Sequence, residues 1–274
     1  MTQPAVSSAI ARLRNLFQDR LFIKTSRGVE PTPRATALWP RIHQMLEDVY
    51  DAVRPNAFDP TQTDRQFRIA MNDISAALIV MHLHRIVHAQ APNASVVLVP
   101  YDPALAEARL VRGELDFLLS VTPPRFAEIR STQLWSAGWV VGGRPGHPLL
   151  TKQLSLADFC LTPQLAINES GDEAVSTLVD ETLKQQGLSR NIKLTINQFT
   201  LAPGVLKSSD LITVLPTRFA TDAATRGLID TRPLPFRLPD AIVFLSWHWR
   251  SDASPALTWM KQCLLDAAIS LNSP

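Results

Sequence analysis

Long hydrophobic runs are missing from this chain of 274 residues. A membrane-spanning helix needs about 20 consecutive apolar residues, whereas the longest candidate, AALIVM, ends at His82. The N-terminus also lacks the series of charged, apolar and small residues that is typical of a signal peptide. Since 46% of the residues are hydrophobic, the chain can still bury sizeable cores, and we expect a globular cytoplasmic protein with no membrane partner.

Cysteine is scarce as well, which limits the redox and metal chemistry of the chain. Cys160 and Cys263 are its only cysteines, and they form no C-x-x-C pair. A disulfide framework or a cysteine zinc site needs more cysteines at closer spacing. We therefore expect two reduced structural thiols, with redox sensing by Cys160 as the alternative that the sequence leaves open.

Familiar catalytic and nucleotide-binding motifs are absent too. The chain has no G-x-x-x-x-G-K phosphate loop, no G-x-G-x-x-G after a predicted strand and no G-x-S-x-G serine elbow. His84 and His88 have the spacing of a zinc pair on a helix, but Arg85 replaces the glutamate of H-E-x-x-H and no third ligand is indicated. We expect no catalytic residue, no metal and no cofactor; a metal-dependent enzyme using these histidines is an alternative from another class.

A basic segment with a helical repeat opens the chain. Residues 2–34 read TQPAVSSAIARLRNLFQDRLFIKTSRGVEPTPR. Apolar side chains four, three and four residues apart, from Val6 to Phe17, predict a helix with one buried face. The residues that follow predict a short hairpin with Arg27 at its tip. The polar side of the helix carries Gln, Ser and Arg, which can contact base edges and phosphates.

Charge is divided unevenly along the chain. The formal net charge of the whole is only +2, but residues 1–34 hold six cationic side chains against Asp19 and Glu30 and so carry +4, which leaves −2 for the rest. A basic head on a mildly acidic body is typical of phosphate binding at one end. A solvated basic helix face is the alternative.

These residues and several later motifs resemble one family. TQPAVSSAIARLR followed by LFIKTSRGVEPTPRA resembles the winged helix-turn-helix of LysR-type transcriptional regulators. GELD at 113–116, GHPL at 146–149, DLITVLP at 210–216 and WHWR at 247–250 extend the resemblance over nearly the whole chain, most closely to the nodulation-regulator-like branch. The resemblance implies a transcriptional regulator that responds to a small-molecule effector, acts as a homodimer or tetramer, and has promoter DNA and RNA polymerase as partners.

Eight side chains of the helix and hairpin are the candidate DNA contacts. They are Thr2, Gln3, Pro4, Ser7, Ser8, Arg12, Lys24 and Arg27. In the family that the chain resembles, two helices precede the recognition helix, and the sequence as given has no residues for them. We therefore expect a partial winged helix-turn-helix in residues 1–32, with a small-molecule binding protein that lacks specific DNA binding as the alternative function.

A predicted dimerisation helix covers residues 33–54. Thr32 and Pro33 form an N-cap and first-turn pair. The apolar residues after them repeat at intervals of three and four, at Ala35, Leu38, Ile42, Met45 and Val49. This heptad pattern predicts a seam between two helices, bent at Pro40, and a helix packed on its own body is the alternative. Residues 55–65, rich in Pro, Asp and Thr, predict a hinge.

From residue 66 onward, predicted strands and helices alternate, which favours an α/β effector-binding domain over 66–274. We expect two parallel-sheet lobes around a cleft, as in periplasmic-binding-protein-like folds. Lobe I covers about 66–140 and 242–274, and lobe II about 141–241. Residues 134–142, near the junction of the lobes, predict one long strand.

Small ligands in such folds lie beyond the carboxyl ends of the strands. In the family that the chain resembles, the corresponding segments line the inducer site. The candidates carried over are Asn72, Asp73, Ser75, Tyr101, Asp102, Ser120, Thr122, Phe199 and Thr200. Helix capping explains Asp73 and Ser75 equally well, Tyr101 and Phe199 can be core residues, and Asp73 would repel a carboxylate-bearing inducer.

Overall fold

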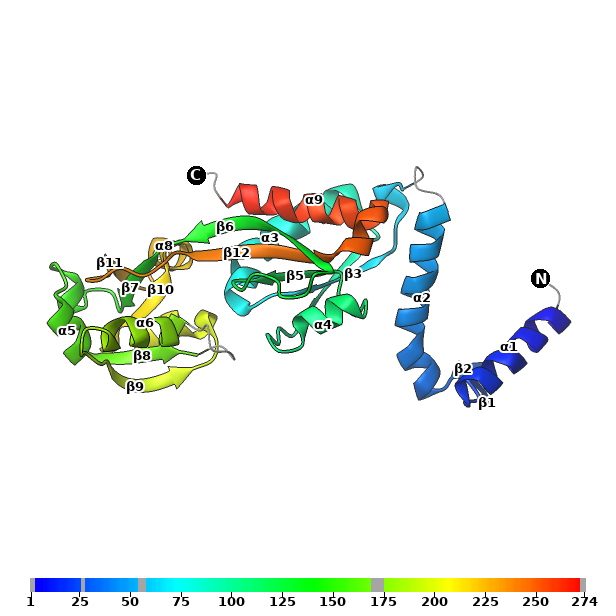
Figure 1. Cartoon of the computed structure of the whole chain (residues 1–274), viewed down its shortest axis with the longest axis horizontal. Coiled ribbons are helices and arrows are strands. Elements are labelled where there is room, and N and C mark those ends of the chain that lie inside the picture. The colour runs from blue at the N-terminus through cyan, green and yellow to red at the C-terminus, as the bar shows by residue number, and fades with distance from the viewer. Residues whose placement is uncertain (1–2, 26–27, 54–57, 169–174, 272–274) are drawn as a thin grey trace. The chain divides into compact units, whose positions relative to one another are not determined.

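The structure is a computed structural model that describes residues 3–25, 28–53, 58–168 and 175–271. The chain forms two compact units, Met1–Phe58 and Asp59–Pro274 (Figure 1). Within the described ranges, no helix is long and apolar enough to cross a membrane.

The first unit consists of a helix, a hairpin and a second helix. Its elements are α1 (Gln3–Phe17), β1 (Phe22–Thr25), β2 (Gly28–Pro31) and α2 (Pro33–Val53). The backbone leaves α1 with positive φ at Gln18 and Leu21, the left-handed conformation that commonly ends a helix. The two strands pair antiparallel with Thr25 opposite Gly28, which confirms the predicted hairpin. Its tip residue Arg27 lies outside the described residues.

Helix α2 begins at the predicted cap. The Thr32 hydroxyl accepts a hydrogen bond from the backbone N–H of Ala35 at 3.1 Å and donates one to Asp19 Oδ1 at 2.7 Å. The same carboxylate accepts from the backbone N–H of Leu21 at 2.7 Å. The hydrogen bonds from Thr32 and then Leu21 hold the pKa of Asp19 below its ordinary value. Helix α2 continues through Pro40 without interruption.

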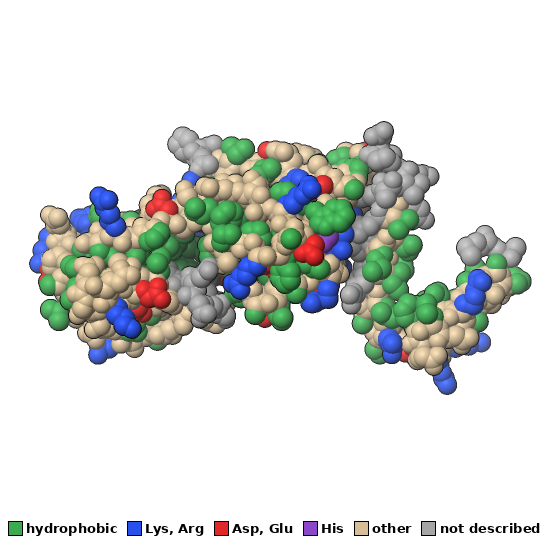
Figure 2. All heavy atoms as spheres, viewed as in Figure 1, with side chains coloured by type: hydrophobic (Ala, Val, Ile, Leu, Met, Phe, Trp, Pro, Cys, Tyr) green, Lys and Arg blue, Asp and Glu red, His purple; other side chains and the backbone are tan. Residues whose placement is uncertain are grey.

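The expected burial of the apolar face of α1 is wrong for this chain. No described residue of α1 is buried, and Val6 and Leu13 are 40% and 43% exposed. Leu21, just before β1, is the only buried apolar residue among those described in the first unit. Two strands of four residues each are too small to cover a helix of 15 residues. Met45 and Val49 of the predicted seam on α2 are exposed as well, and Figure 2 shows apolar side chains along that helix.

The first lobe of the second unit is built on a mixed sheet. Its strands are β3 (Gln66–Ala70), β4 (Ser95–Val99), β5 (Phe117–Ser120), β6 (Ile129–Ala137) and β12 (Ala241–His248). They lie in the order β4-β3-β5-β12-β6, with β3 parallel to β4 and β5, and β12 antiparallel to β5 and β6. The helical elements are η1 (Pro60–Gln62), α3 (Asp73–Gln90), α4 (Ala106–Val111), η4 (Trp249–Ala253) and α9 (Pro255–Ser270).

The second lobe joins a parallel pair to an antiparallel sheet. Its strands are β7 (Trp139–Gly143), β8 (Pro163–Ile167), β9 (Asn191–Ile196), β10 (Thr213–Pro216) and β11 (Asp230–Pro233). β8 and β9 are parallel, β7 lies between the antiparallel strands β10 and β11, and a bridge from Gln164 to Ile212 links the two sets. The helical elements are η2 (Pro148–Leu150), α5 (Leu156–Leu161), α6 (Val175–Lys184), η3 (Phe199–Leu201), α7 (Ala202–Lys207) and α8 (Thr217–Thr225).

Each lobe has its own apolar interior. In the first lobe, Phe67 of β3, Ile79 of α3 and Leu264 of α9 are fully buried, and α3 and α9 lie side by side (Figure 1). In the second lobe, Phe159 of α5 and Leu206 of α7 belong to one large buried cluster. Burying a Leu or Phe side chain stabilises a fold by about 1.5–3 kcal/mol, so each lobe is held mainly by these contacts.

Two strand predictions need correction. The single strand expected over residues 134–142 is two strands, β6 and β7, which belong to different sheets and meet at Gly138. A run of apolar residues does not reveal that the chain passes from one sheet to another. The second lobe is also mixed rather than parallel, because β7 pairs antiparallel with both of its neighbours.

Candidate functional site

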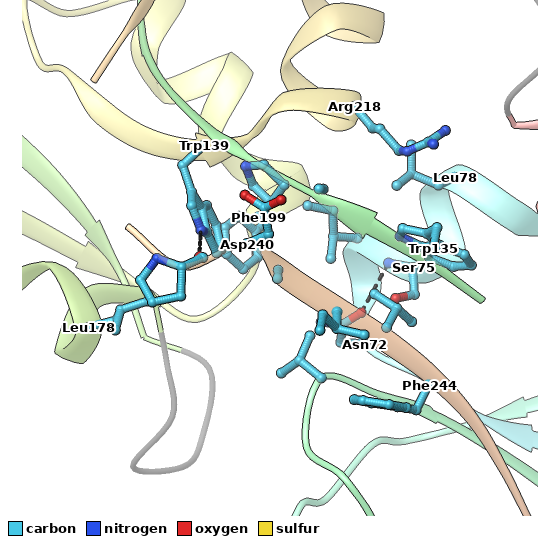
Figure 3. Close-up of a pocket in the computed structure, with 18 of the residues that line it drawn as sticks. Asn72, Ser75, Leu78, Trp135, Trp139, Leu178, Phe199, Arg218, Asp240 and Phe244 are labelled. Carbon is cyan, nitrogen blue, oxygen red and sulfur yellow. Dashed lines mark hydrogen bonds between the residues drawn. The ribbon is translucent and has the colours of Figure 1, made fainter. Parts of the chain in front are cut away.

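A cavity of about 320 Å³ lies where the two lobes of the second unit meet (Figure 3). The start of α3 and the end of β6 contribute to it from the first lobe, and η3 and the start of α8 from the second. The segment before β12 and the strand itself complete the wall. The cavity therefore lies beyond the carboxyl end of β3, at the position where ligands bind in open α/β sheets.

Two of the predicted effector residues shape the first-lobe wall. Asn72 caps α3, and its Oδ1 accepts a hydrogen bond from the backbone N–H of Ser75 at 3.0 Å. Ser75 is 3% exposed and lines the cavity. Among the described residues, none hydrogen-bonds its hydroxyl group. A hydroxyl group both donates and accepts hydrogen bonds, so a ligand in the cavity that offers either a donor or an acceptor can bind it.

Aromatic side chains form much of the remaining wall. Trp135, Trp139, Phe199 and Phe244 all line the cavity, and Phe199, another predicted residue, is buried with 4% exposure. The indole N–H of Trp139 donates to the backbone oxygen of Pro239 at 2.8 Å. This bond fixes the indole plane and ties β7 to the segment that enters β12, so that the flat wall is preorganised for an apolar ligand.

Two charged side chains line the cavity, those of Arg218 and Asp240, and they point in different directions. Arg218 at the start of α8 donates from Nη1 to the backbone oxygen of Leu271 at 2.8 Å. Figure 3 shows its guanidinium beside Leu78 and pointing away from Trp139 and Asp240. Asp240 is exposed and lies beside the indole of Trp139 in the same view. In this arrangement the cavity has a carboxylate at its wall and no cation turned towards its centre among the described residues.

Asp73 and Thr200, two further predicted residues, bind each other across the lobes. Asp73 Oδ2 accepts from the backbone N–H of Thr200 at 2.8 Å and from its hydroxyl at 2.7 Å. The neighbours Asn72, Ile74 and Phe199 line the cavity, although Asp73 and Thr200 do not. The pair therefore connects the start of α3 to η3 directly beside the cavity.

The other four predicted effector residues lie outside the cavity wall. Asp102 Oδ1 accepts from the backbone N–H of Ala104 at 2.9 Å, which is a turn contact. Tyr101 packs partly buried against the core cluster near Leu110. Ser120 donates to the backbone oxygen of Thr122 at 2.8 Å. Val121, between these last two residues, does line the cavity.

Sequence reasoning missed several wall residues, namely Trp135, Trp139, Arg218, Asp240 and Phe244. Trp135 is buried, with 5% exposure, and its sequence neighbourhood is that of an ordinary strand residue. No local pattern marks Arg218 or Asp240, since they reach the cavity through segments far apart in the sequence. A usable signal was Gly138 itself, because an isolated glycine inside a strand pattern can mark an irregularity in the strand.

The candidate DNA contacts lie on the first unit. Gln3, Pro4, Ser7, Ser8 and Arg12 are exposed on α1, and Lys24 is exposed on β1. Thr2 and Arg27 lie outside the described residues. Arg14, which the helical pattern places on the same polar side, has a different contact: its Nε donates to the backbone oxygen of Arg20 at 2.6 Å. Arg14 thus ties α1 to the segment before β1.

The histidine pair and the cysteines form no metal site with a third ligand in the described part of the chain. The rings of His84 and His88 stack with their centroids 5.7 Å apart. Among the described residues there is no group of three or more His, Cys, Asp or Glu placed to hold a metal ion. Burial raises the pKa of the Cys160 thiol, which the charge of Arg190 offsets only in part, and burial raises the pKa of Cys263 to about 12.

Comparisons with known proteins agree with this geometry. Residues 1–36 match the model of the bacterial regulatory helix-turn-helix protein, lysR family, and residues 60–269 match the LysR substrate binding domain. Nodulation protein D 1 of Sinorhizobium fredii (strain NBRC 101917 / NGR234) is 31% identical over 98% of this chain and 83% of its own length. The HTH-type transcriptional activator NagR of a Ralstonia species is 29% identical over 97% and 88%.

A solved structure is similar in fold. The crystal structure of a probable transcriptional regulator from Pseudomonas aeruginosa superposes with a TM-score of 0.72 at 24% identity, over 96% of this chain and 87% of the other.

Proposed function

We infer the function from one premise: the chain belongs to the LysR family of bacterial helix-turn-helix regulators. It is a LysR-type transcriptional regulator with a helix-turn-helix region and a substrate-binding domain. We propose that residues 1–32 contact promoter DNA, 33–54 dimerise, 55–65 act as a hinge and 66–274 bind the effector. Nothing in this function makes or breaks a covalent bond, so we propose a regulator that is not an enzyme.

The exposed polar side of α1 supports the proposed DNA contact. Gln3 and Ser7 are side chains that read base edges, and Arg12 and Lys24 are suited to phosphates. Thr2, Pro4, Ser8 and Arg27 complete the proposed contact set. A protein that acts at promoters works in the cytoplasm and meets RNA polymerase, the further partner that we propose.

The exposed seam of α2 supports the proposed dimer. Met45 and Val49 are 62% and 59% exposed, in register with the heptad pattern that begins at Ala35. A second copy of the helix would cover such a stripe. Two DNA-binding units held side by side also suit the paired half-sites that helix-turn-helix dimers bind.

A selection from random DNA tests the DNA-binding part. The full chain should enrich one sequence, and Gln3→Ala should then relax its preference for that sequence by about 1–3 kcal/mol. Arg12→Ala should weaken binding to all DNA alike, with a shallower salt dependence. Gln185→Ala, which changes an exposed glutamine of the second unit, is the matched control. A chain that enriches no sequence would favour the alternative of a small-molecule binding protein without specific DNA binding.

The single observation that carries the effector role is the mainly apolar cavity at the junction of the two lobes, with Ser75 in its wall. The neutral dye N-phenyl-1-naphthylamine, which fluoresces in apolar surroundings, can probe it. Leu78→Trp places an indole in the cavity wall, and Leu161→Trp makes the same change at a side chain that is 76% exposed. Dye fluorescence should be lost in the first variant and kept in the second. Equal fluorescence in both would place the dye site elsewhere.

A further inference from the structure

Asp73 accepts the hydrogen bonds of two donor groups that Thr200 of the second lobe presents beside the cavity. Thr200 directs both its backbone N–H and its hydroxyl at Asp73 Oδ2, at 2.8 and 2.7 Å. Two donors converging on one oxygen are the kind of group that recognises an anion. Here a side chain of the protein itself takes the place of the anion, so these donors are not available to a ligand.

The second oxygen of the same carboxylate is left without compensation. Asp73 Oδ1 is buried and has no hydrogen-bond partner among the described residues. No salt bridge to Asp73 is present in the described part of the chain. Its negative charge lies beside the cavity, in the first turn of α3. Asp240 adds a second carboxylate at the wall itself, and the Arg218 guanidinium is directed at Leu271.

We propose that Asp73 determines the charge of the effector: the cavity accepts an uncharged, mainly aromatic molecule and rejects an anionic one of the same shape. An anion in the cavity would lie near Asp240 in its wall and near Asp73 beside it, and like charges repel each other. The aromatic wall and the Ser75 hydroxyl suit a neutral molecule with a single polar group. The inference rests on the proposed effector role of this cavity and adds the class of ligand.

Asp73→Asn separates the charge of Asp73 from its contact with Thr200. An amide has nearly the shape of a carboxylate, and its oxygen can still accept both hydrogen bonds from Thr200. The variant thus keeps the connection between α3 and η3 and removes the charge, with an amide NH2 in the place of the buried Oδ1. Asp73→Ser is a second variant in case the amide disturbs folding, since it also removes the charge and leaves the Asn72 cap of α3 in place.

A matched pair of dyes tests the proposal on the full chain. N-phenyl-1-naphthylamine is neutral, and 8-anilino-1-naphthalenesulfonate has the same aromatic frame with an added sulfonate. The wild-type protein should bind the neutral dye at least tenfold more tightly. Asp73→Asn should bind the anionic dye at least fivefold more tightly than the wild type does, while its affinity for the neutral dye changes less than twofold.

The outcomes distinguish the two proposals. If the neutral dye binds in the cavity, as shown by its loss in Leu78→Trp, but the wild type binds both dyes equally, the charge inference fails and the effector role stands. The charge inference also fails if the ratio of the affinities for the neutral and the anionic dye is the same in the wild type, Asp73→Asn and Asp73→Ser. If neither dye shows binding that Leu78→Trp removes, the effector role of the cavity fails, and the charge inference with it.

Discussion

Helices α1 and α9 are similar in length, but α9 buries most of its apolar side chains within the chain, whereas no described residue of α1 is buried. In α9, Met260 and Leu264 are fully buried, whereas in α1 Leu13 and Leu16 are 43% and 73% exposed. Both helices repeat apolar residues at helical spacing, although α9 is the more apolar of the two overall. The difference lies in what surrounds them: α9 packs on α3 and a five-stranded sheet, and α1 has only a short hairpin. Apolar periodicity therefore predicts a face, and the rest of the fold decides whether that face is covered.

The largest expected effect contrasts the two units directly. Phe159→Ala should lower the free energy of unfolding of the second unit by about 3–5 kcal/mol, because a fully buried ring in contact with Phe236 leaves a cavity. Leu13→Ala should cost less than about 0.5 kcal/mol, since that side chain is already exposed. Urea unfolding followed by circular dichroism measures both. Similar losses for the two variants would mean that Leu13 is covered in solution, for example by a second copy of the chain.

A smaller effect is expected at the Thr32 cap in the first unit. Thr32→Ala removes the cap on Ala35 and the hydrogen bond to Asp19, and should destabilise α2 locally by about 0.5–2 kcal/mol. Thr36→Ala, one turn later at an exposed position, is the matched control. Hydrogen exchange of the Ala35 amide should speed up in the first variant only. Equal exchange in both would show that the cap contributes little to the start of α2.

Acid should weaken the second unit through His248. Burial lowers the pKa of this imidazole, and the charge of Arg250 acts in the same direction while Glu128 opposes it. The unfolded chain, with a histidine pKa of about 6.5, then takes up the proton first. The contribution of neutral His248 to the free energy of unfolding is thus fully present above pH 6.5. It is lost as the pH falls through the pKa of His248 in the folded state. His248→Asn keeps an acceptor for the backbone N–H of Arg250 and should flatten the loss of stability between pH 7 and pH 5. An unchanged slope would assign the acid sensitivity to other groups.

The smallest effect concerns reactivity and leaves stability unchanged. With a pKa of about 12, Cys263 holds only about one thiolate in ten thousand at pH 8, and it is buried. Cys160 is only partly buried, so a thiol-specific reagent should label it first in the native protein, and both cysteines in denaturant. Mass spectrometry of the labelled chain identifies the site. The first unit contains no cysteine, so the labelling reports on the second unit alone. Equal labelling rates of Cys160 and Cys263 in the native protein would mean that the interior around α9 opens readily.

Local patterns predicted the elements that local contacts form. The cap of α2 at Thr32 follows from a side chain within four residues of the group it binds. Helix α3 is capped by Asn72, and not by Asp73 or Ser75 as the sequence suggested. The expected hairpin and most strands of the second unit depend in the same way on short-range periodicity. Helices α5 and α8 and strand β11 were missed, because they are short and their patterns carry little information.

The cavity was predictable only in part, for a physical reason. Asn72, Ser75 and Phe199 lie at strand and helix ends, where a general rule places ligands, and all three line the wall. Trp139 and Arg218 reach the same wall because β7 and α8 begin there, which is a property of the chain's path between sheets and not of any local segment. The Asp73–Thr200 contact joins residues 127 positions apart, and nothing in either segment alone indicates the other.

The place of β12 in the first sheet has a consequence for how the protein is made. This strand lies between β5 and β6, yet it leaves the ribosome after the whole second lobe. During synthesis, the edge of β5 that pairs with β12 therefore stays unpaired until residues 241–248 have been translated. The second lobe, whose strands are contiguous in the chain, can fold during that delay. Contacts between distant segments form slowly, and open edges favour wrong pairing. The chain would thus be most vulnerable to aggregation and to chaperone capture in the interval before its last strand is translated.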